Sequence, residues 1–223
     1  MSLAKVILDV VDSTILALYT AVTVRMYGGW RSGSRYTTLA QRLLPQIRKD
    51  SPGIFLMKHG DAIVKLRLVV ELADYPIGTQ SALLEETFVR DRDLRNFRCQ
   101  SFPLDSCANI GTCGMGGLIN LTASTQCDEP GCAKKIGDVF VRDEQKMVDT
   151  LIVADIAHQA LVAKTQHIVI VSSDTDMWPG VVLALQAGRD VIHIHTNPAW
   201  RTQRHLMNTI RGRLGKSYKQ TWI

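Results

Sequence analysis

The 223-residue chain lacks any run of eighteen apolar residues free of charge, so we expect no membrane-spanning helix. Its apolar beginning is interrupted by Lys5, Asp9 and Asp12, which excludes the uncharged core of a secretion signal. The cysteines number five, and an odd number without such a signal argues against a disulfide framework. A hydrophobic content of 46% is ordinary for a globular protein. We therefore expect a cytoplasmic protein.

Acidic residues are missing from the last part of the chain, although the net charge is only +5. From Arg201 onward the charged side chains are Arg201, Arg204, Arg211, Arg213, Lys216 and Lys219. Such a segment suits a nucleic-acid partner, because each neutralised phosphate releases a counterion. The four arginines are candidate nucleic-acid contacts. A solvated helix that only keeps the protein soluble is the alternative interpretation.

Hydrophobic periodicity predicts strands that alternate with helices. Residues 3–19 fit either one helix or a strand over 5–11 followed by a helix. The later segments predict strands over 22–27, 64–72, 167–172 and 190–195, and helices over 37–47, 145–163, 179–186 and 205–214. This alternation predicts one α/β domain over residues 1–223, a three-layer fold with a mostly parallel sheet and helices on both faces.

Two aspartates, Asp174 and Asp176, follow the apolar strand predicted over 167–172. In parallel sheets, ligands bind at the carboxyl ends of the strands. Carboxylates so close together repel each other, and a hard cation such as Mg²⁺ or Mn²⁺ relieves that repulsion. The alternative is that one aspartate caps the next helix and the other is solvated.

A second acidic pair, Asp149 and Asp155, lies on the helix predicted over 145–163. Six residues of helix advance about 9 Å and turn the side-chain direction by about 120°, so only one of the two is expected to face a shared metal. Asp149 is near the helix N-terminus and is the stronger candidate. Asp155 either orients a ligand indirectly or satisfies buried backbone groups.

These segments resemble the NYN branch of the PIN-like nuclease superfamily. The matching stretches read KMVDTLIVAD (146–155) and VSSDTDMWP (171–179), and the resemblance is strongest over 140–196. The segment RMYGGW (25–30), which includes the end of the strand predicted over 22–27, also looks like the family's second strand. The resemblance implies a PIN-like, Rossmannoid fold and metal-dependent hydrolysis of nucleic-acid phosphodiesters, of RNA more than of DNA.

The resemblance also implies roles for individual residues. Asp149, Asp174 and Asp176 are expected to hold Mg²⁺ or Mn²⁺ and to position water, with Asp155 counted among the catalytic candidates. The ion would polarise the phosphate and lower the pKa of the attacking water. Ser173 is expected to donate a hydrogen bond to a carboxylate or a phosphate oxygen. Lys146 is expected either to neutralise charge on the phosphate or to hold an aspartate in place.

The sequence departs from the family at its first strand, which ordinarily ends in a further aspartate. Only Asp9 and Asp12 precede residue 22, so one of them supplies this ligand or the ligand is missing. A missing ligand favours the alternative function, a catalytically weak PIN-like module that binds nucleic acid or a protein partner. A third possibility, another phosphoryl-transfer enzyme, lacks any phosphate-loop motif in this sequence. The sequence leaves the oligomeric state open, and a homo-oligomer is compatible with it.

Residues 99–137 are irregular, rich in glycine and cysteine, and look like an inserted module. Cys107, Cys113, Cys127 and Cys132 form two pairs whose spacing, a little long in the first pair, suits a structural Zn²⁺ site. The alternative is a loop with incidental thiols. Cys99 is left over and is expected to pack in the interior.

Overall fold

The fold is that of a computed structural model, whose described residues are 11, 13–79, 83–91, 126–127, 129–196 and 217–222. The chain divides into two compact units. One comprises Met1–Thr87 together with Gln145–Ile223, and the other is Phe88–Glu144. No helix in the described part is long and apolar enough to cross a membrane.

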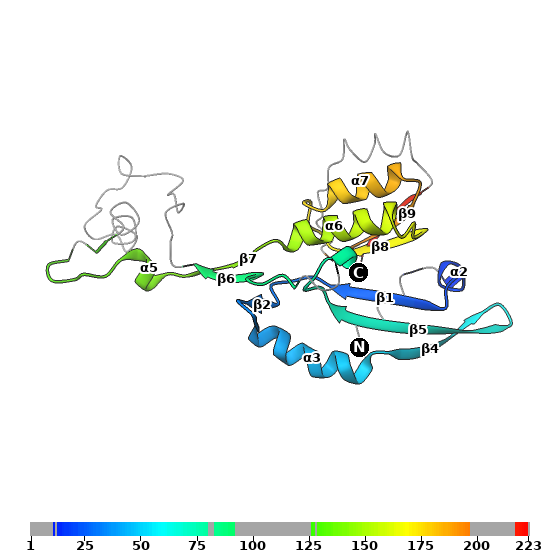
Figure 1. Cartoon of the computed structure of the whole chain (residues 1–223), viewed down its shortest axis with the longest axis horizontal. Helices are drawn as coiled ribbons and strands as arrows, with labels where there is room; N and C mark the ends of the chain where they lie inside the picture. The colour runs from blue at the N-terminus through cyan, green and yellow to red at the C-terminus, as the bar shows by residue number, and fades with distance from the viewer. Residues whose placement is uncertain are drawn as a thin grey trace, which may run out of the picture. The chain divides into compact units, whose positions relative to one another are not determined.

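The first half of the larger unit contains a three-stranded sheet in the order β1-β5-β4 (Figure 1). Strand β1 (Ala21–Met26) is parallel to β5 (Ala62–Leu72), and β4 (Gly53–His59) is antiparallel to β5. The short turn that joins β4 to β5 uses Gly60 at φ 58°, a conformation that glycine adopts without strain.

Helix α3 (Thr38–Asp50) covers part of this sheet. The hydroxyl of Thr37 accepts a hydrogen bond from the backbone N–H of Ala40 and caps the first turn. Ala40 packs in one cluster with Trp30 and Leu72, so α3 is anchored near the carboxyl end of β5. Two short strands, β2 (Arg31–Ser32) and β3 (Arg35–Tyr36), form the antiparallel pair that leads into the helix. A four-residue helix, α2 (Ser13–Leu16), precedes β1.

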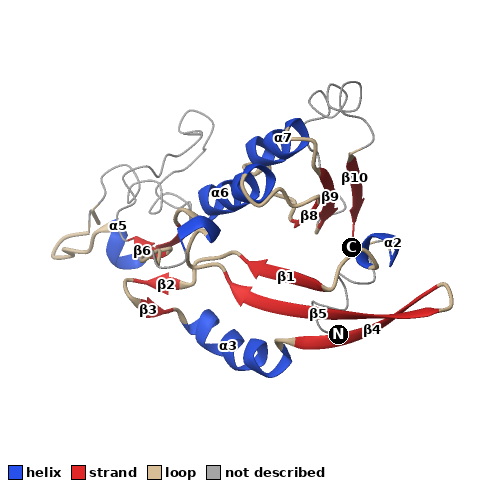
Figure 2. Cartoon of the chain, turned by 45° about the vertical axis from the view of Figure 1, so that its right-hand side comes forward, coloured by secondary structure: helices blue, strands red, loops and turns tan. Residues whose placement is uncertain are grey.

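The second half of this unit contains a parallel sheet in the order β10-β9-β8 (Figure 2). Its strands are β8 (His167–Val171), β9 (Asp190–His195) and β10 (Tyr218–Trp222). Helices α6 (Val148–Leu161) and α7 (Trp178–Gln186) lie side by side and pack on one face of it. The opposite face contributes Ile192 and Ile194 to a cluster with Leu66 of β5. Both faces are buried, as apolar strands of this kind require.

The smaller unit contains β6 (Phe88–Asp91), the helix α5 (Ile136–Val139) and most of β7 (Arg142–Gln145). Strands β6 and β7 pair with each other, and Arg90 forms an exposed ion pair with Asp143 at 2.8 Å. A single bridge joins Gln126 to Lys135. This unit spans the range in which the sequence predicts an inserted module.

The α/β class and the parallel pairing of β8 with β9 confirm the sequence prediction. The described strands form several small sheets, and a single mostly parallel sheet is not found among them. The hairpin partner β4 and the last strand β10 were not predicted. The helix predicted from residue 145 begins at Val148, because β7 extends to Gln145 and Met147 has φ 63°. The helix predicted over 205–214 lies outside the described residues.

Candidate functional site

The loop that follows β8 carries the two aspartates. Hydrogen bonds within the loop and to β9 hold its backbone in place. The backbone N–H of Ser172 donates to the carbonyl of Ile194 on β9 at 3.0 Å. The N–H of Asp174 donates to Ser172 Oγ, and the N–H of Asp176 donates to Asp174 Oδ1, both at 3.0 Å. Asp174 and Asp176 are exposed. Neither carboxylate caps α7, whose N-cap residue is Met177, without a side-chain hydrogen bond.

Ser173 ties the ends of two neighbouring strands together. Its Oγ accepts a hydrogen bond from the backbone N–H of Thr196, the residue after β9, at 2.9 Å. The hydroxyls of Ser173 and Thr196 lie 3.2 Å apart. These contacts join the carboxyl ends of β8 and β9 beside the aspartate loop. The two ends lie at the same edge of the sheet because the strands are parallel.

Asp149 joins this acidic region from the first turn of α6. The helix returns the chain to the start of β8, so its N-terminus lies toward the edge where β8 ends. Partial burial and the negative charges of Asp174 and Asp176 raise the pKa of Asp149. Asp149 therefore feels the charges of the other two aspartates that the sequence singled out.

No ion pair within the described part neutralises Asp149, Asp174 or Asp176. Three carboxylates without a cationic partner among the described residues are a donor set that suits a hard divalent ion. Among the described residues, however, no three acidic, histidine or cysteine side chains are close enough together to hold a metal.

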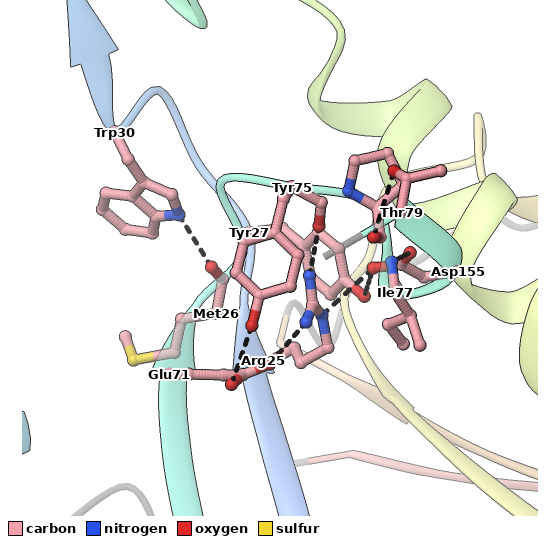
Figure 3. A network of polar contacts seen from close by, with 10 residues as sticks. Arg25, Met26, Tyr27, Trp30, Glu71, Tyr75, Ile77, Thr79 and Asp155 are labelled. Atoms are coloured by element: carbon pink, nitrogen blue, oxygen red, sulfur yellow. Dashed lines mark hydrogen bonds and ion pairs between the residues drawn. The ribbon is translucent and has the colours of Figure 1, made fainter. Parts of the chain in front are cut away.

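Asp155 faces a different environment, although it lies on the same helix (Figure 3). It is buried, with only 2% of its surface exposed. Its Oδ1 accepts the backbone N–H of Ile77, and its Oδ2 accepts the hydroxyl of Tyr27, both at 2.8 Å. Arg25 Nε completes an ion pair with Oδ2 at 3.1 Å. The interpretation that Asp155 satisfies buried backbone is confirmed, and its oxygens are occupied by protein donors.

Arg25 is the central residue of this network, and the sequence did not identify it. Its guanidinium also pairs with Glu71 and donates to the carbonyl of Tyr75. It stacks over the ring of Tyr75, 4.8 Å from the centroid. Burial and the adjacent Asp155 charge raise the pKa of Tyr27 above its usual range. The network joins α6 to β1 and to the segment that follows β5.

The buried side chain of His193 contacts the backbone at the start of the aspartate loop. The sequence did not identify this histidine. His193 Nε2 lies 2.9 Å from the carbonyl oxygen of Ser172, and its Nδ1 lies 2.9 Å from the hydroxyl of Tyr218. A carbonyl only accepts, so Nε2 carries the proton and Nδ1 accepts from Tyr218. The ring stacks on that of His195 at 4.1 Å. Burial and the neighbouring His195 lower the pKa of His193 to about 4.

The remaining predicted site residues are described only in part. Lys146 is exposed and lies in the turn between β7 and α6. Cys127 and Cys132 are free, half-buried thiols on either side of a turn in which Gly131 has φ 82°. Outside the described residues lie Asp9, Asp12, Cys99, Cys107, Cys113, Arg201, Arg204, Arg211 and Arg213.

Comparison with known proteins adds no relative. No protein-family model, no curated protein and no solved structure matches this chain.

Proposed function

We propose that the chain is a metal-dependent nuclease that hydrolyses nucleic-acid phosphodiesters, RNA more readily than DNA. The observation that supports it most is the raised pKa of Asp149, which burial and the charges of Asp174 and Asp176 produce together. Carboxylates that repel one another do not stabilise the fold. Their electrostatic interactions become favourable when a cation binds between them. Perturbed groups of this kind are enriched at functional sites.

The chemistry assigned to the site follows from its donors. Asp149, Asp174 and Asp176 would hold Mg²⁺ or Mn²⁺, which lowers the pKa of a bound water and polarises a phosphate. Asp174 Oδ1 accepts the N–H of Asp176, while no described donor contacts Oδ2. Ser173 already accepts from Thr196, which fixes its oxygen at the mouth of the site.

The proposed function also implies a particular fold. We infer a PIN-like, Rossmannoid architecture from the resemblance over 140–196. The parallel order β10-β9-β8, with α6 and α7 on one face, supports it.

A second candidate function is a PIN-like module that binds nucleic acid or protein without efficient cleavage. It is favoured by the lack of any three metal-ligating side chains at binding distance in the described part. It is also compatible with a missing first-strand aspartate, since Asp9 and Asp12 lie outside that part.

Cleavage assays on labelled RNA and DNA, with Mn²⁺ or with EDTA, separate the two candidates. The nuclease proposal expects Mn²⁺-dependent cleavage that falls to background in Asp174→Asn and Asp149→Asn. Asparagine retains the shape of the side chain and removes its charge. Asp61→Asn, in the exposed turn between β4 and β5, is the matched control and should cleave like the wild type. Cleavage retained by Asp174→Asn, or absent from the wild type, moves the binding module to first place.

We also propose that Cys127 and Cys132 bind structural Zn²⁺ together with Cys107 and Cys113. Their position around a glycine turn suits a zinc knuckle. Elemental analysis of protein never exposed to chelator should find near one zinc per chain, reduced by Cys127→Ser. Protein purified in this way without zinc contradicts the proposal.

The basic segment from Arg201 onward is proposed to contact phosphates. Replacing Arg204, Arg211 and Arg213 by glutamine should weaken binding to every sequence alike and flatten its salt dependence. An unchanged salt dependence assigns the segment to solubility or to a protein contact.

A further inference from the structure

A groove opens beside the acidic site and runs along α7. Asp176 and Thr175 line one end of it, and Gln186 lines the other. Pro179, Val182 and Leu183 form its largely apolar wall. Its volume is about 540 Å³, within the range of small-molecule sites. Because Asp176 belongs to both, the groove and the aspartate cluster are continuous.

Trp178 also lines this groove and carries an unsatisfied hydrogen-bond donor. The residue is 3% exposed, and its ring packs against those of His193 and Tyr218. Its indole Nε1–H is buried and has no acceptor among the described residues. Leaving a donor in this state costs free energy, and such orphaned groups are uncommon in folded proteins. The N–H itself is sealed from solvent, so a ligand acceptor in the groove removes that cost only when the indole turns toward it.

We propose that this groove binds a nucleoside of the substrate, next to the phosphate that the aspartates address. An apolar wall suits the face of a base, and the exposed Gln186 amide offers a donor and an acceptor to its edge. The Trp178 indole donates to a carbonyl or ring nitrogen of the base, or to a sugar oxygen. The nine residues of α7 extend about 13 Å, so the groove accommodates one nucleoside, or two at most.

This subsite rests on the proposed nuclease function for its occupant, but its binding is measurable without catalysis. Fluorescein-labelled tetranucleotides of each base, as RNA and as DNA, are titrated with protein in EDTA and followed by fluorescence anisotropy. Trp178→Phe keeps an aromatic ring and removes the donor, and it also leaves part of the buried indole volume empty. Trp222→Phe, an exposed tryptophan on β10, is the matched control.

Binding to at least one tetranucleotide should weaken by about tenfold in Trp178→Phe and remain unchanged in Trp222→Phe. Because phenylalanine fills less of this buried position than tryptophan, the melting temperature of unliganded Trp178→Phe should fall, so binding is compared at a temperature at which both proteins are folded. Gln186→Ala is exposed and cannot disturb the core. It should reduce the differences in affinity among the four bases. The RNA and DNA series show which sugar the groove prefers.

Wild-type affinity in both Trp178→Phe and Gln186→Ala overturns the subsite, as does undetectable binding of every tetranucleotide by the wild type. Cleavage assays run in parallel keep the two proposals apart. Binding that is sensitive to Trp178 without any cleavage preserves the subsite and rejects the nuclease. Cleavage together with wild-type binding in both variants preserves the nuclease proposal and rejects the subsite.

Discussion

Two aspartates on α6, six residues apart, occupy opposite electrostatic environments. Asp155 is buried beside Arg25 and accepts hydrogen bonds from Tyr27 and Ile77. Asp149 has two negative neighbours instead, Asp174 and Asp176, and no described cation. A buried charge must be paired inside the protein, whereas a partly exposed charge can be left for a ligand. One carboxylate of this helix therefore stabilises the fold, and the other is the one for which we propose a bound cation.

The difference extends to the elements around each carboxylate. The Asp155 network also involves Glu71 and Tyr75, so several elements depend on one cluster of charges. The Asp174 loop is held by hydrogen bonds that involve its backbone, its serines and His193, and by no ion pair among the described residues. Sites that depart from the rules of a stable interior are those where function is expected. Four measurements test whether this contrast is real.

Removing the fold-supporting carboxylate should have the largest effect. Asp155→Asn leaves Arg25 buried and without its partner on α6, while Glu71 retains part of the pairing. We expect a loss of about 3 kcal/mol in the free energy of unfolding, since breaking a buried pair costs about 3–5 kcal/mol. Urea denaturation measures it, with Asp174→Asn as the comparator from the other region. A loss in Asp155→Asn no larger than in Asp174→Asn removes the contrast.

Lowering the pH should reduce the contribution of His193, which contacts the aspartate loop, to the free energy of unfolding. The folded-state pKa of His193 is about 4, below the unfolded value near 6.5, so the unfolded chain binds the proton first. Its contribution is complete above pH 6.5 and is lost as the pH falls toward 4, by at most about 3 kcal/mol.

Denaturation at several pH values should show this loss in the wild type and a flatter curve in His193→Gln, which retains a donor for Ser172. His59→Gln, on the β4–β5 hairpin, controls for the removal of one histidine. Parallel curves for wild type and His193→Gln show that His193 is not the group responsible.

Binding of Mn²⁺ should stabilise the aspartate region and leave the Arg25 network unaffected. A ligand present at 100 times its Kd raises the free energy of unfolding by about 2.7 kcal/mol. Thermal melts with increasing Mn²⁺ should show a rising melting temperature in the wild type and Asp61→Asn, but not in Asp174→Asn. Mn²⁺ that stabilises all three equally binds elsewhere.

The sequence predicted much of the α/β framework because its signals are local. The apolar run at 167–171 and the glycine at 188 delimit β8 and α7 without knowledge of distant residues. It missed β10 and the pairing of β4 with β5, since strand partners are set by tertiary packing. It also expected one sheet where the described strands form several.

The same division applies to the site. Asp149, Asp174 and Asp176 were proposed as site residues from their positions near predicted strand and helix ends, which are local signals. Arg25 and His193 were not identified, since their roles depend on contacts across 130 and 21 residues, with Asp155 and Ser172. Asp155 was left open between two interpretations for the same reason. Only its partners, distant in sequence, decide between them.

The smallest change in the free energy of unfolding should come from removing the repulsion between Asp149 and its two acidic neighbours. Asp149→Asn takes one negative charge from a partly exposed cluster, so without metal we expect it to stabilise the fold by less than about 1 kcal/mol. The folded-state pKa of Asp149 is raised, so the folded protein holds this proton to higher pH than the unfolded chain does. The penalty in the wild type therefore grows as the pH rises through that range and is absent at low pH, where Asp149 is protonated in both states. Melting curves of wild type and Asp149→Asn in EDTA should diverge above the acid range and converge below it. Adding Mn²⁺ should reverse their order, because only the wild type retains the full carboxylate set. An Asp149→Asn protein that is less stable than the wild type in EDTA at neutral pH would place Asp149 with Asp155, as a residue that serves the fold.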